Sequence, residues 1–324
     1  KKPDLLHFVA EAVSDSGGSI IYLNNTHPFK IKIFYGAESY FVKFSIYNIT
    51  HGGGVKRSRN EFRIQVKESV FEVEEGYKTL ILGYFDELQV FAGFDITKHQ
   101  RAGYSASFQI KEENLLQASL NGFSACDKGN EEIAIAFKPD FFVEYVRNLE
   151  TLHLFGELRQ GASLLETIIS TPSISNDELL QNLSPKRQLV VQTILKKNRE
   201  SNFRACVLRA YNYRCAFSGI QLKLVDAAHI LPVSSDISTD ETSNGIALSS
   251  LHHKAYDRGL ITFDTSYRIV INQKEITRLQ SLNLDGGWEN FKKNLNSLVN
   301  VPPAPTDRPN PQYIAIANTL RGWQ

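Results

Sequence analysis

Apolar and polar residues alternate with a two-residue period through much of the first half of the chain. This period is typical of half-buried β-strands, and the runs that show it are rich in β-branched and aromatic residues. Turn residues separate the runs, so we expect mostly antiparallel neighbours. We also predict one helix at 4–13 and another at 139–149. The predicted strands occupy 19–23, 29–35, 40–47, 62–66, 79–84, 88–94 and 105–110.

Beyond residue 160 the pattern changes from strands to short helical pieces. A longer helix is expected to begin at Ser184-Pro185, with Ser as the N-cap and Pro in the first helical position. Its apolar pattern continues, with interruptions, to Tyr211. We therefore predict an α+β chain with a β-rich domain at 1–160, a linker at 161–184 and a second domain at 185–324.

Composition narrows the class of protein. The chain has 324 residues, of which 42% are hydrophobic and 22% charged, as in globular proteins of ordinary two-domain size. No apolar run approaches the roughly 18 residues that span a bilayer, and the start shows no signal-peptide pattern. Three scattered cysteines favour a reducing compartment, so we predict a cytoplasmic protein. The net charge is only +1, so any surface for nucleic acid must be a local patch.

Three short apolar segments in the second domain each contain a polar residue that could take part in catalysis or bind a metal. His229 is followed by Ile-Leu-Pro, Asn244 is followed by glycine, and His253 belongs to the run His-His-Lys-Ala-Tyr-Asp-Arg-Gly. His229 suits the end of the first strand of a β-hairpin, Asn244 suits the turn that leads into the last helix, and His253 suits that helix. The order His, Asn, His resembles the HNH nuclease family. This resemblance implies a C-terminal ββα-metal domain that hydrolyses phosphodiester bonds.

The resemblance also implies a role for each of these residues. His229 would be the general base, for which an imidazole with an unperturbed pKa of about 6.5 is well suited. Asn244 would either ligate a metal or fix the loop that orients the base. His253 would be a metal ligand, while His252 points elsewhere on the helix and is expected to be structural. Taken singly, each residue is as well explained by a structural role.

The expected cofactor is a divalent cation, Mg²⁺ or alternatively Mn²⁺ or another ion. Many relatives carry an acidic metal ligand directly before the general base, where this chain has Ala228. Asp226, two residues further back, is therefore a candidate ligand, although on a strand it shares a face with Ala228 and not with His229. Some relatives also bind a structural zinc ion through two Cys-x-x-Cys pairs. Only Cys215 remains of them here, so we expect no structural zinc.

A basic cluster in the first domain is the candidate for DNA recognition. It follows three glycines at 52–54 and runs into a predicted strand. Its cationic side chains could bind phosphates or guanine, and its amides could bind adenine. A solvated hairpin loop is the alternative explanation. Patches within 40–110 are also similar to N-terminal modules of restriction-type enzymes. The residues of the cluster are Lys56, Arg57, Arg59, Asn60, Arg63 and Gln65.

These observations predict a restriction-type endonuclease that cuts double-stranded DNA and leaves 5′-phosphate and 3′-hydroxyl ends. Because one HNH site cuts one strand, a homodimer is expected. Two alternatives stay open. One is a defence nuclease that cuts any DNA once its first domain binds a signal molecule. The other is a DNA-binding protein with an inactive HNH fold.

Overall fold

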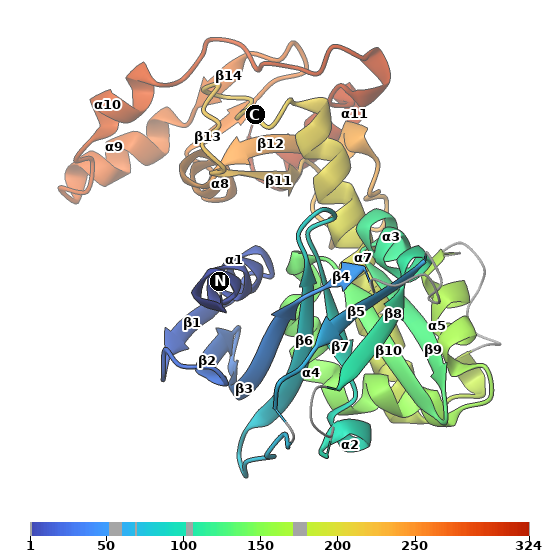
Figure 1. Cartoon of the computed structure of the whole chain (residues 1–324). Helices are drawn as coiled ribbons and strands as arrows, with labels where there is room; N and C mark the ends of the chain where they lie inside the picture. The colour runs from blue at the N-terminus through green and yellow to red at the C-terminus, as the bar shows by residue number, and fades with distance from the viewer. Residues whose placement is uncertain (1, 52–59, 69, 102–105, 171–179, 324) are drawn as a thin grey trace. The chain divides into compact units, whose positions relative to one another are not determined.

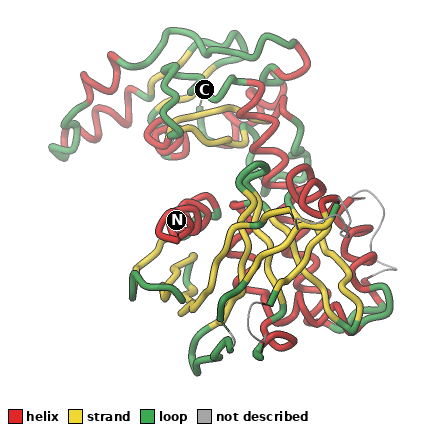
Figure 2. Tube along the Cα trace, in the orientation of Figure 1, coloured by secondary structure: helices red, strands yellow, loops and turns green. Residues whose placement is uncertain are grey.

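The computed structural model describes residues 2–51, 60–68, 70–101, 106–170 and 180–323. The chain divides into two compact units, Lys1–Asn198 and Arg199–Gln324, and each is considered by itself below. Figure 1 labels their helices and strands, and Figure 2 shows where strands and helices alternate along the trace. The mixed class predicted from the sequence, with a β-rich first part, is confirmed.

Most strands of the first unit form one sheet. Among the described residues, this sheet has seven strands in the order β1-β2-β3-β6-β7-β10-β9, and a smaller sheet has the order β4-β5-β8. The strands are β1 (Ser19–Tyr22), β2 (Phe29–Tyr35), β3 (Glu38–Asn48), β4 (Thr50–His51), β5 (Glu61–Gln65), β6 (Lys78–Phe85), β7 (Val90–Phe94), β8 (Ser107–Lys111), β9 (Phe123–Gly129) and β10 (Glu132–Phe137). The helices are α1 (Lys2–Asp15), α2 (Ile96–His99), α3 (Glu112–Asn121), α4 (Phe142–His153) and α5 (Gly161–Ser170), with 3₁₀ turns η1 (Pro139–Phe141) and η2 (Leu154–Glu157).

One pair in the large sheet departs from the antiparallel expectation. β3 and β6 run parallel, with Phe44 opposite Leu80, whereas the other neighbouring strands are antiparallel. Between β3 and β6 the chain leaves the sheet and contributes β4 and β5 to the smaller one. A parallel pair requires such a crossover, and the two-residue period alone does not reveal it.

The large sheet is covered on both faces by separate hydrophobic cores. In β6, Leu80 and Leu82 point into one core, while Ile81 and Phe85 point into the other. The first core is closed by α1, α4 and α5, and the second by α3 and the β4-β5-β8 sheet. Both faces of β6 and β7 are therefore buried, which explains their nearly continuous apolar sequences.

The segment predicted to be a linker belongs in part to the first unit. α5 buries Ala162, Leu165 and Ile168 in the first core. The next long helix, α7 (Pro185–Ala210), starts at the predicted residue and adds Val190 and Ile194 to the same core. The division between the units therefore falls inside α7, after Asn198, and differs from the predicted boundary. These apolar side chains pack against the large sheet, so they cannot belong to a free linker.

The second unit is built around a β-hairpin followed directly by a helix. β11 and β12 pair antiparallel, with Val225 opposite Ser249 and His229 opposite Gly245. The helix α8 begins at the next residue, which completes the expected ββα order. The elements after α7 are β11 (Val225–His229), η3 (Thr242–Asn244), β12 (Gly245–Ser249), α8 (Ser250–Asp257), β13 (Ile261–Phe263), β14 (Ile269–Ile271), α9 (Gln273–Ser281), α10 (Trp288–Lys293), η4 (Pro305–Asp307) and α11 (Pro311–Leu320).

Within the described part of the chain, no helix combines the length and the apolar character that crossing a bilayer requires.

Candidate active site

The ββα unit carries all three residues selected from the sequence motifs. His229 is the last residue of β11, as predicted, and His253 lies on α8. Asn244 was predicted to lie in a turn before the helix, but it directly precedes β12, and α8 begins at Ser250. Gly245 is extended, with φ of −115°, so Asn244-Gly245 is the entry to a strand and not a tight turn.

The His229 side chain is held by two neighbours. Its ring stacks on the ring of Phe203 in α7, with centroids 3.8 Å apart and planes at 10°. Its Nε2 atom lies 3.0 Å from Oδ1 of Asp240, in the loop between β11 and β12. The side chain is 18% exposed, so the imidazole is fixed in place and still reaches solvent.

A glycine opposite His229 makes the stacking possible. A Cβ atom added to Gly245 would lie 3.1 Å from Cζ of Phe203 and 2.2 Å from Cγ2 of Val207. The second distance is far below van der Waals contact, so α7 could not keep its place against this strand. The missing side chain thus lets Phe203 pack beside the strand pair and reach His229.

Asn244 is fully buried, and hydrogen bonds occupy both ends of its amide. Oδ1 accepts from the backbone nitrogen of Leu231 at 2.9 Å. Nδ2 donates to the oxygen of Thr239 at 2.8 Å, to Oγ of Ser238 at 3.1 Å and to the oxygen of Leu231 at 3.4 Å. These contacts fasten the loop that contains Asp240 to the end of β11.

Asp226 forms an ion pair with the side chain of Arg204. Its Oδ1 lies 2.7 Å from Nε of Arg204 and also accepts from the backbone nitrogen of Ala227 at 2.9 Å. Arg204 lies one residue after Phe203 on α7. Both members of the pair are about half exposed, so the pair is worth less than ~1 kcal/mol and Asp226 could be released at little cost.

His253 pairs with an acidic side chain one turn further along α8. Its Nε2 lies 3.6 Å from Oδ2 of Asp257, and both side chains are partly exposed. A nitrogen and a carboxylate oxygen are suitable donors for a divalent cation. Among the described residues, however, no group of three or more His, Cys, Asp or Glu side chains could hold a metal ion. The chain therefore offers a donor pair at this point, and further ligands would have to come from water or substrate.

His252 has a different environment from its neighbour. It is buried, and its Nδ1 lies 2.7 Å from Oγ of Ser249, 3.5 Å from Sγ of Cys215 and 3.5 Å from Oγ of Ser218. Burial raises the pKa of the Cys215 thiol, but hydrogen bonds from His252, Ser218 and the backbone of Ser249 and Phe217 outweigh it and lower the pKa to about 6. This cluster joins the start of α8 to the segment before β11. It lies in the region where the resemblance to the HNH family would place the two Cys-x-x-Cys pairs of a structural zinc site.

The described part of the basic cluster lies on and beside β5. Ile64 of this strand is buried in the second core of the first unit, so Arg63 and Gln65 project from the opposite face. Asn60, just before the strand, is exposed. The remaining predicted contacts, Lys56, Arg57 and Arg59, lie outside the described residues.

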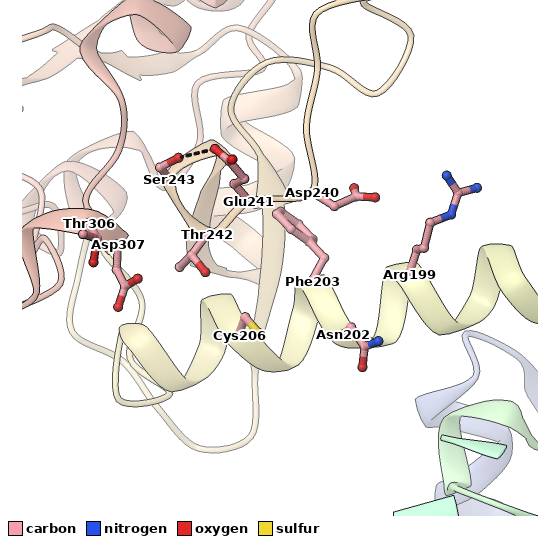
Figure 3. A pocket seen from close by; sticks show the side chains of 10 residues that line it. All are labelled: Arg199, Asn202, Phe203, Cys206, Asp240, Glu241, Thr242, Ser243, Thr306 and Asp307. Atoms are coloured by element: carbon pink, nitrogen blue, oxygen red, sulfur yellow. Dashed lines mark hydrogen bonds between the residues drawn. The ribbon is translucent and has the colours of Figure 1, made fainter. Parts of the chain in front are cut away.

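Phe203 and Asp240 were missed by the sequence reasoning. Both line a cleft of about 530 Å³ in the second unit, which α7 forms with the loop before β12 and with η4 (Figure 3). In the sequence, Phe203 cannot be distinguished from any other apolar residue on the buried face of a helix. Asp240 lies in a polar loop near Asp236 and Glu241, and no periodicity distinguishes it from them.

Comparisons with known proteins match two separate parts of the chain. Residues 215–264 match the family described as HNH endonuclease, and residues 42–146 match the family described as Methylase-associated X1. The first match contains His229, Asn244 and His253. The chain therefore carries an HNH endonuclease domain, and the resemblance stated from its motifs is confirmed.

Among solved structures, the chain is similar to one described as "Modification dependent TagI restriction endonuclease". The two share 10% sequence identity and superpose with a TM-score of 0.30. The similarity covers 86% of this chain and 80% of that chain. No curated protein matches.

Proposed function

We propose that the protein is a metal-dependent restriction-type endonuclease that cuts double-stranded DNA and leaves 5′-phosphate and 3′-hydroxyl ends. One observation carries the proposal: within an HNH endonuclease domain, His229 is fixed by a stacked ring and a carboxylate while it still reaches solvent. A general base needs this combination, because it must meet water in a constant orientation. We assign His229 to that role.

Asn244 is proposed to hold the loop and not to ligate the metal. Its complete burial and its occupied amide support this choice between the two roles that the motif leaves open. A metal ligand would need a lone pair directed into open space. By holding the loop, Asn244 would keep Asp240 beside His229.

His253 is proposed as the ligand of a divalent cation, Mg²⁺ in the simplest case, with Asp257 beside it. Asp226 is the weaker candidate, because on β11 it shares a face with Ala228 and not with His229. When bound, the cation would supply positive charge to the scissile phosphate. Mg²⁺ prefers about six oxygen ligands, so a site with these two donors should bind it weakly in the absence of DNA.

The first unit is proposed to select the DNA. Arg63 and Gln65 project together from the outer face of β5, and the other basic residues of the cluster precede this strand in the sequence. The description of the family that matches 42–146 links it to a methylase, in keeping with restriction systems. Because one site cuts one strand, we further propose a homodimer, which light scattering of the intact protein would test.

The test is cleavage of unmodified and base-modified plasmid DNA in the presence of Mg²⁺ or Mn²⁺. Wild type, His229→Ala and His7→Ala are compared, since His7 is an exposed histidine of α1 with no part in the proposed site. We expect discrete fragments from wild type and His7→Ala, and at least about 100-fold slower cutting by His229→Ala. Ligation and end labelling of the fragments identify the 5′ and 3′ ends.

Other outcomes would redirect the proposal. A smear of fragments would favour the signal-dependent, non-specific nuclease. Equal cutting by wild type and His229→Ala would refute the assignment of the base. Binding of DNA without cutting on any substrate would favour the inactive HNH fold.

A further inference from the structure

The hydrogen bond between Asp240 and His229 determines where the imidazole carries its proton. The two atoms are Oδ1 and Nε2, 3.0 Å apart. An ionised carboxylate only accepts hydrogen bonds, so Nε2 must be the donor. The lone pair of the neutral ring is then on Nδ1. Among the described residues, no other group is hydrogen-bonded to the His229 side chain, so Nδ1 remains available to a water molecule.

The ring of Phe203 restrains the orientation of the imidazole plane. The rings are nearly parallel, at 10°, and their centroids are 3.8 Å apart. Stacking restrains the plane of the ring, and the bond to Asp240 restrains its rotation within that plane. Phe203 is itself buried, so its position is set by packing.

We propose that Asp240 is a positioning residue that holds His229 in the tautomer with the proton on Nε2, so that Nδ1 acts as the base. The proposal rests on the proposed nuclease function. Nδ1 takes a proton from water as the water oxygen forms a bond to phosphorus. The bond between phosphorus and O3′ breaks, its electron pair stays on O3′, and this oxygen takes a proton from solvent. Asp240 remains ionised and stabilises the imidazolium that forms.

Other charged groups lie near this arrangement. Arg199 and Arg204 lie on α7, Asp226 on β11, Glu241 next to Asp240 in the loop, and Asp307 on η4. Arg204 and Asp226 neutralise each other at 2.7 Å, and Glu241 accepts a hydrogen bond from Ser243 at 3.4 Å. Figure 3 shows Asp240 and Arg199 on the side of the cleft where Phe203 lies. The carboxylate of Asp240 is the one in hydrogen-bond contact with His229.

The kinetic test compares wild type with Asp240→Asn and Asp236→Asn. Asp236 is exposed in the same loop and provides the same change of charge without a contact to His229. Single-turnover cleavage is measured over a range of Mg²⁺ concentrations. We expect Asp240→Asn to cut about 100-fold more slowly, because an amide can donate as well as accept and therefore no longer holds the proton on Nε2. Asp236→Asn should match wild type.

A role as metal ligand would change the Mg²⁺ concentration that gives half-maximal cutting. A changed Mg²⁺ requirement or an unchanged rate in Asp240→Asn would each overturn the proposal.

A second measurement does not depend on cutting. The ¹⁵N shifts of His229 in selectively labelled protein report the tautomer, with His229→Ala used to assign the signals. We expect the Nε2-H form in wild type and a mixture of tautomers in Asp240→Asn. A dominant Nδ1-H form in wild type would overturn the proposal. If the Nε2-H form is found but no DNA is cut, the positioning by Asp240 stands and the nuclease function fails.

Discussion

The substitution Asn244→Asp separates the two roles that the motif allows for this residue. The change is nearly isosteric, and it replaces Nδ2, whose two hydrogens are shared among three acceptors, by an oxygen that can only accept when ionised. The new oxygen would face the carbonyl oxygens of Thr239 and Leu231, now 2.8 Å and 3.4 Å from Nδ2. If Asn244 holds the loop, the variant loses stability. If Asn244 ligates the cation, a carboxylate should bind it at least as well.

The loss can be estimated from these contacts. Each hydrogen bond contributes about 1 kcal/mol, and each buried polar group left unpaired costs about 1–3 kcal/mol more. The side chain is fully buried, so solvent cannot take over. The carbonyl oxygen of Leu231 keeps its hydrogen bond from Oγ of Ser238 at 3.0 Å, so only that of Thr239 is left unpaired. This unpaired oxygen, the lost hydrogen bonds and the buried carboxyl together suggest a loss of about 4 kcal/mol. For a unit of this size, that corresponds to a decrease of about 15 °C in Tm. The deficit should shrink at low pH, where the new carboxyl binds a proton and donates again.

Tryptophan fluorescence is a selective assay for this loss. The chain has two tryptophans, Trp288 and Trp323, and both lie in the second unit. Thermal unfolding is followed for wild type, Asn244→Asp and the control Asn300→Asp, which makes the same change at an exposed position. Titration with Mn²⁺ gives the affinity for the cation. A Tm within about 2 °C of wild type, together with tighter Mn²⁺ binding, would refute the role in the loop.

Two further expectations concern the same unit and the same fluorescence assay. The pKa of Cys215 is lowered from its ordinary value of 9.0 to about 6. Between these values the unfolded chain binds more protons, so stability should rise from pH 6 to pH 9 by up to about 4 kcal/mol. Cys215→Ser should lose this rise, whereas exposed Cys206→Ser should keep it; parallel pH profiles of wild type and Cys215→Ser would contradict the expectation. Gly245→Ala should cost about 2 kcal/mol because its Cβ would meet Val207, and adding Val207→Ala should restore part of the loss. Equal stability of the single and double variants would exclude this clash as the cause.

The periodicity of the sequence predicted those helices and strands whose boundaries depend only on residues nearby in the chain. The helix that starts at Pro185 and the strand that ends at His229 follow the prediction, because caps and alternation are local properties. The parallel pairing of β3 with β6 and the packing of α5 against the first sheet are long-range properties. The sequence of α5 is compatible with a helix in a linker, and only contact with the sheet shows that it belongs to the first unit.

The candidate site shows the same contrast between local and long-range properties. The motifs located His229, because its frame of Ile-Leu-Pro is a local signal. They did not reveal Asp240, which reaches the imidazole only because the loop returns to the end of β11. Nor did they reveal the use of Gly245. Its small size matters through the distance to Val207 on α7, far away in the sequence.

Burial distinguishes the three motif residues, which the sequence presents as equals. A residue that exchanges a proton with water or binds an ion carried by a phosphate must keep a polar atom accessible. His229 and His253 meet this condition, with side chains 18% and 30% exposed. Asn244 does not, since it is fully buried and bonded at both ends of its amide. We therefore propose that the motif combines two residues placed for chemistry with one that holds the loop between them. Substitutions should divide accordingly: those at the histidines should lower activity in a folded protein, and those at Asn244 should lower stability first.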